Sequence, residues 1–219
     1  MENPLDWSPI DTVLLDMDGV LLDLQYDNWF WRQHVPARYA DRHEISLEEA
    51  KSRVYPKMHA VRGTIDWYCV DYWSDTLELD IVELKTNSAH RVRIRPQVAE
   101  FLVSIRKVTN GVHLVTNAHR KTIELKFART GLGRYFDEII CAHDYGVPKE
   151  DLSFWAGMFR DRAFDPARTL FIDDNLDVLR SAKEFGIGYL RTVEQPDSGE
   201  PGIEVEEFDA IRTFAEIMP

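Results

Sequence analysis

Cysteine is scarce in this sequence, and its scarcity argues against one class of protein. Only two of the 219 residues are cysteines, Cys69 and Cys141, and they lie far apart in the chain. A small domain held together by disulfides is therefore not expected, and a reducing cytoplasm is the default location. Neither cysteine has a companion at a zinc-like spacing, so we interpret both as buried apolar residues.

Long apolar runs and an excess of basic residues are also missing. No stretch approaches the roughly 20 apolar residues that cross a bilayer, and residues 1–9 lack the basic start and apolar centre of a signal peptide. With 26 basic and 38 acidic side chains, the formal net charge is −12, which argues against a nucleic-acid polymer as partner. A small phosphorylated molecule stays compatible with this charge, since a metal ion and a few local donors can reverse the sign of a site. No pattern indicates an oligomeric state.

The most informative segment that is present follows the apolar run Val13-Leu14-Leu15 and reads Asp16-Met17-Asp18-Gly19-Val20. Side chains two apart on an extended chain project in nearly the same direction, and glycine then lets the chain turn away. Two carboxylates so close raise each other's pKa, so an ionised pair at neutral pH implies a cation between them or a shared proton. The motif alone therefore fits two interpretations: a metal site beside a carboxylate nucleophile, or aspartates that cap the following turn.

From residue 97 onward, helical and extended patterns alternate. Val98, Phe101, Leu102 and Ile105 are spaced like one buried helix face, and short apolar runs follow each such pattern. We expect helices near 97–107, 120–130, 152–159 and 178–185, and strands near 13–15, 111–115, 139–141, 169–172 and 189–190. This alternation predicts an α/β fold, a Rossmann-like parallel sheet with helices on both faces. In such folds the functional residues gather beyond the carboxyl ends of the strands.

Residues 24–91 have a different character. They hold four of the six tryptophans, Trp29, Trp31, Trp67 and Trp73, and helical spacing fits them better than strand alternation. Ser46 followed by two glutamates at 48 and 49 is typical of a helix N-cap with an acidic first turn. We therefore predict a mainly helical insertion. Its aromatic side chains could stack against a purine or could form the core of the insertion itself, and both interpretations stay open.

Four groups of polar residues stand at or near the predicted strand ends: Asp16 with Asp18, Thr116-Asn117, Lys149, and Asp173-Asp174. In this order they resemble the four motifs of the haloacid dehalogenase superfamily, a group dominated by Mg²⁺-dependent phosphatases. The resemblance covers essentially the whole chain. It implies a core domain formed by residues 1–23 and 92–219, and a helical cap domain formed by residues 24–91.

The resemblance also implies a role for each of these residues. Asp16 would be the nucleophile that forms an aspartyl-phosphate, and Asp18 the general acid and base, with its backbone carbonyl on the metal. Thr116, Asn117 and Ala118 would hold phosphate oxygens, and Lys149 would offset negative charge. Asp174 would bind Mg²⁺ directly, and Asp173 directly or through water.

Two positions depart from the family pattern. Position 20 is valine where many relatives have threonine, and Glu150 follows Lys149 where proline is common. We expect the glutamate to change only the way in which the next helix begins.

The segments 66–74, 114–119 and 146–151 are similar to a bacterial member of the superfamily that dephosphorylates the purine mononucleotides GMP and IMP. This similarity predicts Mg²⁺-dependent hydrolysis of purine 5′-mononucleotides. Sugar-phosphate phosphatases and phosphomutases share the same aspartate pair and stay open as alternatives. Dehalogenases and phosphonate hydrolases lack the acid at position 18, so Asp18 argues against both classes. A non-catalytic binding module, the alternative of a different class, would be expected to have lost Asp16 or the metal-binding carboxylates.

Overall fold

A parallel sheet is the centre of the structure, a computed structural model that describes residues 5–219. Residues 1–4, part of the stretch in which no signal peptide is expected, lie outside the described residues. The sheet has six strands in the order β3-β2-β1-β4-β5-β6. The strands are β1 (Thr12–Leu15), β2 (Gly111–Thr116), β3 (Glu138–Cys141), β4 (Thr169–Ile172), β5 (Tyr189–Val193) and β6 (Ala210–Ile211).

The central strand, β1, is buried along its whole length. A continuous apolar run of this kind is typical of a parallel strand covered on both faces. Leu15 pairs with Leu114 of β2 on one side and with Ile172 of β4 on the other. After β1 the chain continues outward to β3, and it then returns to build β4, β5 and β6 on the other side. The strand order therefore reverses between β1 and β4, and ligands of open α/β sheets bind beyond the carboxyl ends of strands at such a reversal.

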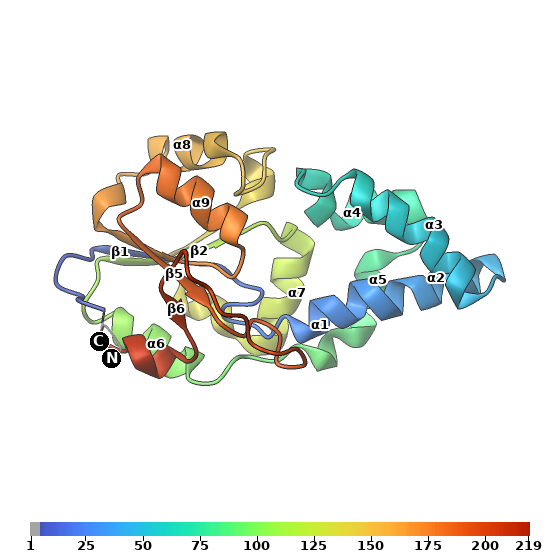
Figure 1. Cartoon of the computed structure of the whole chain (residues 1–219), viewed down its shortest axis with the longest axis horizontal. Helices are drawn as coiled ribbons and strands as arrows, with labels where there is room; N and C mark the ends of the chain where they lie inside the picture. The colour runs from blue at the N-terminus through green and yellow to red at the C-terminus, as the bar shows by residue number, and fades with distance from the viewer. Residues whose placement is uncertain (1–4) are drawn as a thin grey trace.

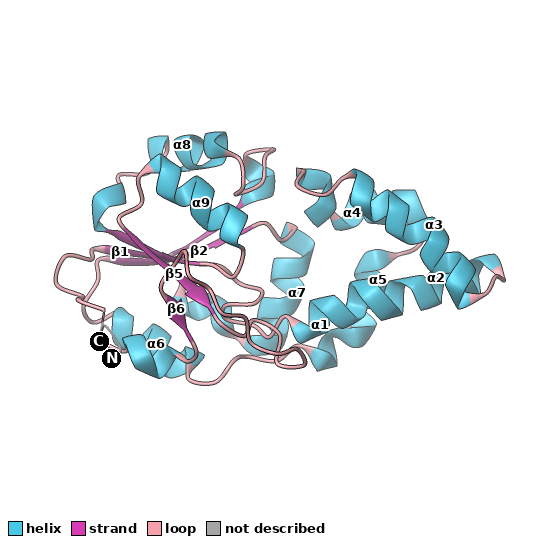
Figure 2. Ribbon diagram, viewed as in Figure 1, coloured by secondary structure: helices cyan, strands magenta, loops and turns pink. Residues whose placement is uncertain are grey.

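Two pairs of helices cover the two faces of the sheet (Figure 2). Along β1, Val13 and Leu15 belong to one apolar cluster and Leu14 to the other, because side chains alternate along a strand. The first cluster includes apolar residues of α6 and α7, and the second includes those of α8 and α9. These helices are α6 (Val98–Ile105), α7 (Arg120–Thr130), α8 (Leu152–Arg160) and α9 (Leu176–Phe185). The α/β fold with helices on both faces is thus confirmed.

The local signals explain most of the element boundaries. Helix α7 ends at Gly131 and α9 at Gly186, both in the left-handed conformation that glycine tolerates. Helix α9 begins earlier than the apolar spacing indicates, because the Asn175 side chain accepts a hydrogen bond from the Asp177 amide at 3.0 Å and caps it. Strand β6 was not predicted, since two residues are too few to show the alternation of a strand.

The helices of residues 24–91 lie beyond one end of the sheet (Figure 1). They are α1 (Gln25–Trp29), a π-type turn (Phe30–His34), α2 (Val35–His43), α3 (Leu47–Ala60), α4 (Val70–Leu77) and α5 (Ile81–Ser88). Ser46 caps α3 as expected, since its hydroxyl accepts from the Glu49 amide at 3.2 Å. None of the helices formed by residues 5–219 combines the length and the apolar character needed to cross a membrane.

The two connections between the insertion and the sheet run side by side. Leu22 and Ile94 form an antiparallel bridge. The Asp23 amide donates to the Arg93 carbonyl at 2.9 Å, and the Arg95 amide donates to the Leu21 carbonyl at 3.0 Å. Domain boundaries fall at short connections between two parts of a chain, and these two connections are where the insertion joins the core. We therefore propose that residues 24–91 form a cap domain and that residues 1–23 and 92–219 form the core domain.

The turn after β1 depends on Gly19. Its φ is +87°, and a Cβ built there would lie 2.5 Å from the Asp174 carboxylate. Gly63 has a similar φ of +80° but no heavy atom within 4 Å of such a Cβ. The two glycines therefore separate the cost of backbone strain from the cost of a steric clash.

We expect Gly63→Ala to lower the free energy of unfolding by about 1 kcal/mol through backbone strain alone. Gly19→Ala should lower it by about 2 to 4 kcal/mol, because displacement of the Asp174 side chain adds to that strain. Urea denaturation of both variants measures the difference. Equal losses would show that Asp174 is not held against the turn.

Candidate active site

Three carboxylates gather at the carboxyl ends of β1 and β4. Asp16, Asp173 and Asp174 each offer an oxygen, and these oxygens lie within 4.8 Å of one another. Asp16 and Asp173 become neighbours because each follows a strand residue of the pair Leu15–Ile172. The Asp16 amide extends this pairing by donating to the Ile172 carbonyl at 3.0 Å. The register of two strands therefore assembles a group of acids that are far apart in the sequence.

Lys149 supplies the positive charge of this group. Its side chain is only 2% exposed, and its Nζ pairs with Asp16 and lies 2.6 Å from an oxygen of Asp173. Nζ also donates to the Val115 carbonyl at 3.0 Å. Burial by itself lowers the pKa of Lys149, but the two aspartates raise it above its ordinary value, so the ammonium keeps its proton.

Negative charge still exceeds positive charge at this strand end. Burial raises the pKa of Asp16 to about 6, with Lys149 acting against the shift and Asp173 adding to it. Burial, together with Asp173 and Asp16, raises the pKa of Asp174 well above its ordinary value. One lysine does not neutralise three carboxylates in a buried setting. Hard oxygen donors of this kind fit Mg²⁺, so these residues suit the cation that the sequence motifs imply.

Asp18 turns toward a second group of buried charges. Its carboxylate lies 2.6 Å from Nζ of Lys126, which is fully buried on α7. The same Nζ lies 2.6 Å from Asp27 on α1, and the second oxygen of Asp27 lies 3.0 Å from Nζ of Lys85 on α5. Four alternating charges thus connect the strand end to two helices of the insertion. Burial, together with Asp27 and against Lys126, raises the pKa of Asp18 to about 6.

The aspartate pair at 16 and 18 was expected to project in nearly the same direction, and the partners of the two residues show otherwise. Strand β1 ends at Leu15 and the chain bends at Met17, so the extended geometry behind that expectation stops too early. Lys126 was not anticipated either. It lies on the buried face of α7 with Thr122 and Ile123, so a lysine within an apolar helical stripe was the available signal.

The end of β2 and the loop after it are formed by Thr116, Asn117 and Ala118. Hydrogen bonds connect these residues within the loop and to Lys149. The Thr116 hydroxyl accepts from the Ala118 amide at 3.1 Å. The Asn117 side-chain oxygen accepts from the Lys149 backbone amide at 2.8 Å. The residue that caps α7 is His119, so Thr116 does not serve as the cap of this helix. The loop instead joins the end of β2 to the segment that carries the buried lysine.

Glu150 does more than begin the next helix, and our expectation for it was wrong. Its carboxylate accepts a hydrogen bond from the Tyr68 hydroxyl at 2.6 Å. It also accepts from the side-chain nitrogens of Asn117 at 2.9 Å and Asn175 at 3.2 Å. Tyr68 belongs to the insertion and both asparagines to the core. Burial and the adjacent Glu150 raise the pKa of Tyr68 above its ordinary value, which keeps its hydroxyl protonated as a donor. Sequence could not show this, because all the partners are distant in the chain.

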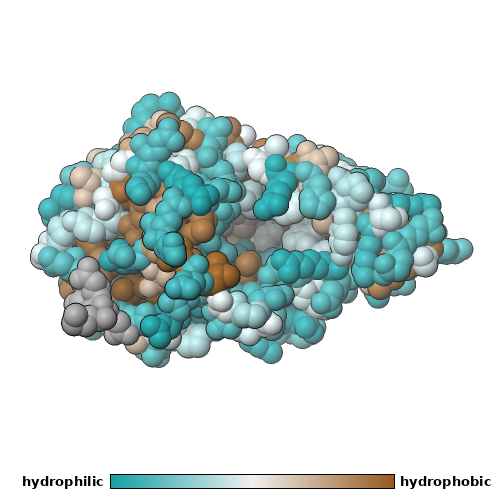
Figure 3. Space-filling model, in the orientation of Figure 1, coloured by the Kyte–Doolittle hydropathy of each residue, from teal (hydrophilic) through white to brown (hydrophobic). Residues whose placement is uncertain are grey.

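A cavity of about 630 Å³ lies between the two parts of the chain, where the space-filling view shows a recessed surface (Figure 3). Its core end is lined by Asp18 and by Ala118 and His119 of the loop after β2. Its outer wall is aromatic and includes Trp31, Tyr55, Trp67, Tyr68 and Trp73. Of these, Trp73 is only 1% exposed and belongs to the core of the insertion as well. The interpretation as the core of the insertion therefore holds for Trp73, and stacking against a purine stays a prediction for the rings that line the cavity.

The arginines at 91, 93 and 95 do not line this cavity. The Arg91 guanidinium lies 4.1 Å from the Trp29 ring centroid. Arg93 donates to the His90 carbonyl at 2.9 Å, and Arg95 donates to the Gln195 carbonyl at 2.6 Å. In this structure these arginines contact residues in and beside the connections between the insertion and the sheet.

Comparison with known proteins finds a match between residues 10–186 and the family model described as haloacid dehalogenase-like hydrolase. A GMP/IMP nucleotidase of Escherichia coli, YrfG, is 36% identical over 213 residues, which cover 97% of this chain and 96% of that protein. A haloacid dehalogenase phosphatase of Thermococcus onnurineus superimposes with a TM-score of 0.77 at 24% identity, covering 94% of this chain and 95% of that one. CbbY of Rhodobacter sphaeroides, solved with xylulose-1,5-bisphosphate, gives a TM-score of 0.66 at 15% identity over 94% of this chain and 96% of its own.

The buried position of Lys126 predicts a large energetic effect. Lys126→Met leaves Asp18 and Asp27 without this counter-charge and should lower the free energy of unfolding by about 3 to 5 kcal/mol. Lys121→Met on the same helix is the matched control. Its ion pair with Asp71 is about half exposed, with side-chain exposures of 51% and 49%, so its loss should cost less than about 1 kcal/mol.

Urea denaturation at neutral pH measures both variants. Similar losses for the two substitutions would contradict the idea that Lys126 neutralises buried acids.

Proposed function

The chain belongs to the haloacid dehalogenase-like hydrolase family, and on that premise we propose that it is a Mg²⁺-dependent phosphatase of purine 5′-mononucleotides such as GMP and IMP. One observation carries the proposal. Asp18, two residues after Asp16 of the carboxylate group at the ends of β1 and β4, lines the core end of an aromatic cavity formed with the insertion. Phosphoryl transfer needs positioned charges at the reacting group, and a nucleoside needs an apolar space beside it.

The proposed reaction has two steps. The carboxylate of Asp16 attacks phosphorus, a P–O bond to Asp16 forms, and the bond to the leaving oxygen of the nucleoside breaks as Asp18 gives that oxygen a proton. Asp18 then takes a proton from water, which attacks the aspartyl-phosphate and releases inorganic phosphate. Asp16 is regenerated, so no other reactant is consumed.

The remaining site residues would manage charge. Asp16, Asp173 and Asp174 would hold Mg²⁺, which when bound offsets the negative charge of the phosphoryl oxygens. Lys149 would offset more of this charge through its contacts with Asp16 and Asp173. The hydroxyl of Thr116 and the backbone amides of Asn117 and Ala118 would donate to the phosphate. For Ala118 this means giving up its present bond to Thr116.

The cavity favours a purine nucleoside over a smaller leaving group. Its volume of about 630 Å³ and its wall of tryptophan and tyrosine rings suit a flat aromatic base. The similarity to YrfG, described as a GMP/IMP nucleotidase, supports the same substrate class. We also propose a cytoplasmic location, which the two free cysteines fit.

Asp16→Asn is expected to lower kcat by roughly a thousandfold or more, since no other group then provides the nucleophile. Phosphate release from GMP, IMP and a panel of sugar phosphates measures this and the substrate class together. The control is Asp177→Asn, whose exposed side chain pairs with Arg180 at 2.6 Å and should leave turnover unchanged. Full activity of Asp16→Asn would rule out the mechanism, and activity on sugar phosphates with none on GMP or IMP would rule out the substrate class.

Glu150 should be needed for turnover as well as for holding the insertion. In Glu150→Gln an NH₂ group faces one of the three donors that now meet the carboxylate, so Asn117 or Tyr68 must move. We expect kcat/KM to fall by about tenfold or more, because Asn117 positions the Lys149 segment. Tyr68→Phe removes only the contact with the insertion and should lower kcat/KM by a smaller factor. An equal or larger loss in Tyr68→Phe would contradict a role for Glu150 in the core.

A further inference from the structure

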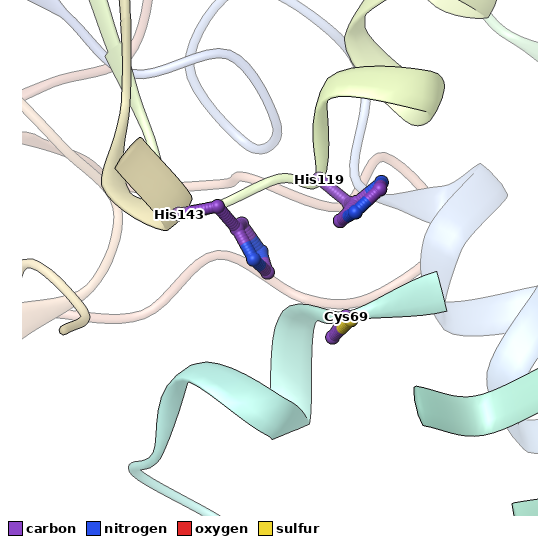
Figure 4. Close-up of side chains that lie close together, drawn as sticks. All are labelled: Cys69, His119 and His143. Carbon is purple, nitrogen blue, oxygen red and sulfur yellow. The ribbon is translucent and has the colours of Figure 1, made fainter. Parts of the chain in front are cut away.

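One cysteine and two histidines meet where the insertion faces the core. Cys69, His119 and His143 each offer a ligand atom, and these atoms lie within 4.8 Å of one another. Cys69 immediately precedes α4 of the insertion, His119 immediately precedes α7, and His143 lies in the short helix Ala142–Asp144 after β3. Figure 4 shows Cys69 across a gap from the two histidines, on the side of the insertion.

We propose that this group binds a transition-metal ion of the zinc class and that the ion fastens the insertion to the core. Thiolate and imidazole are the donors that Zn²⁺ and its neighbours prefer, whereas Mg²⁺ prefers oxygen. The group therefore differs in chemistry from the carboxylates at the ends of β1 and β4. Zinc–ligand distances of roughly 2.0 to 2.3 Å place ligand atoms roughly 3.3 to 3.8 Å apart, so small side-chain movements complete the site.

One of the two histidines has a ring nitrogen without a hydrogen-bond partner within residues 5–219. Nε2 of His143 is buried and has no hydrogen-bond partner among the described residues. A buried polar atom left without a partner destabilises the folded chain, and a metal ion bound there would remove that cost. Burial, and for His143 also the neighbouring His119, lowers the pKa of both histidines. Both rings are therefore neutral at neutral pH, which is the form that binds metal ions.

The surroundings of His119 also suit a metal ligand. Its Nε2 lies 3.7 Å from the carboxylate of Asp71, which Lys121 holds at 2.7 Å. A carboxylate beside the ring is the usual outer partner of a metal-binding histidine. In the described chain the hydrogen bond of the ring, from the Lys121 amide to Nδ1, is long at 3.4 Å, so it opposes a turn of the ring toward an ion only weakly.

The position of the ligands determines what the ion would do. Cys69 belongs to the insertion, whereas His119 and His143 belong to the core. His119 directly follows the Thr116–Ala118 loop and His143 follows β3. A bound ion would therefore hold the insertion closed over the cavity. Opening would require the metal–thiolate bond to break, and the Cys69 thiol would then recover the proton that it loses on binding.

Optical titration with Co²⁺ tests the site without any assay of turnover. The reduced full-length chain is first saturated with Mg²⁺ to fill the carboxylate site. One equivalent of Co²⁺ should then produce thiolate-to-cobalt charge-transfer absorption in the near ultraviolet, and Zn²⁺ should abolish it. Cys141→Ala, which changes the other cysteine, should keep the absorption, and Cys69→Ser should lack it. Absence of the band in the unaltered protein, or its persistence in Cys69→Ser, would overturn the proposal.

Hydrogen exchange tests the fastening separately. With Mg²⁺ present, Zn²⁺ should slow amide exchange in α4 of the unaltered protein and of Cys141→Ala, but not in Cys69→Ser. His143→Ala should weaken Co²⁺ binding by more than the roughly tenfold that loss of an outer partner of a metal ligand costs. Equal protection by Zn²⁺ in Cys69→Ser would assign the effect to the carboxylate site and reject the fastening. Neither measurement depends on the identity of the phosphate ester.

Discussion

Neutralisation of buried negative charge at the end of β1 is the constraint on which the rest of the structure depends. Asp16 leaves the central strand in a buried position and Asp18 in a half-buried one beside the cavity, and each pairs with a lysine there. Lys149 comes to Asp16 from the segment before α8, and Lys126 comes to Asp18 from α7. Both lysines are buried more completely than lysine normally is in a folded protein. Two core helices and their loops are thus placed by the charges of one strand end.

The same constraint couples the insertion to the site. Lys126 is shared with Asp27 of α1, and Asp27 is shared with Lys85 of α5. On the other side of the cavity, Tyr68 reaches Glu150 beside the buried lysine of the core. The insertion therefore contacts the core through polar groups at both sides of an aromatic space, and one apolar cluster also spans the two parts, with Leu15 of β1 and Trp73 of α4 among its members. An enzyme that closes over its substrate needs contacts that can break, and the polar contacts beside the cavity suit this need.

Much of the fold could be read from particular residues. The run Val13-Leu14-Leu15 and the helical stripe of α6 show burial through spacing alone, and Gly131 and Gly186 mark helix ends through their backbone freedom. Candidate site residues were also accessible where the chain places them directly after a strand, as with Asp16 and Asp173. Glu150, Lys126 and the Cys69 group were not, since their partners lie far away in the sequence and only packing brings them together.

Local spacing and short motifs were enough to predict the alternation of strands and helices, the acids at the strand ends and the presence of a helical insertion. The partner of each charged side chain depends instead on how distant elements pack. In the folded chain Asp18 pairs with Lys126, Glu150 accepts a hydrogen bond from Tyr68, and Cys69 lies close to two histidines. The physical reason is that side-chain partners across a cavity depend on the relative placement of whole elements, which no local pattern of residues records.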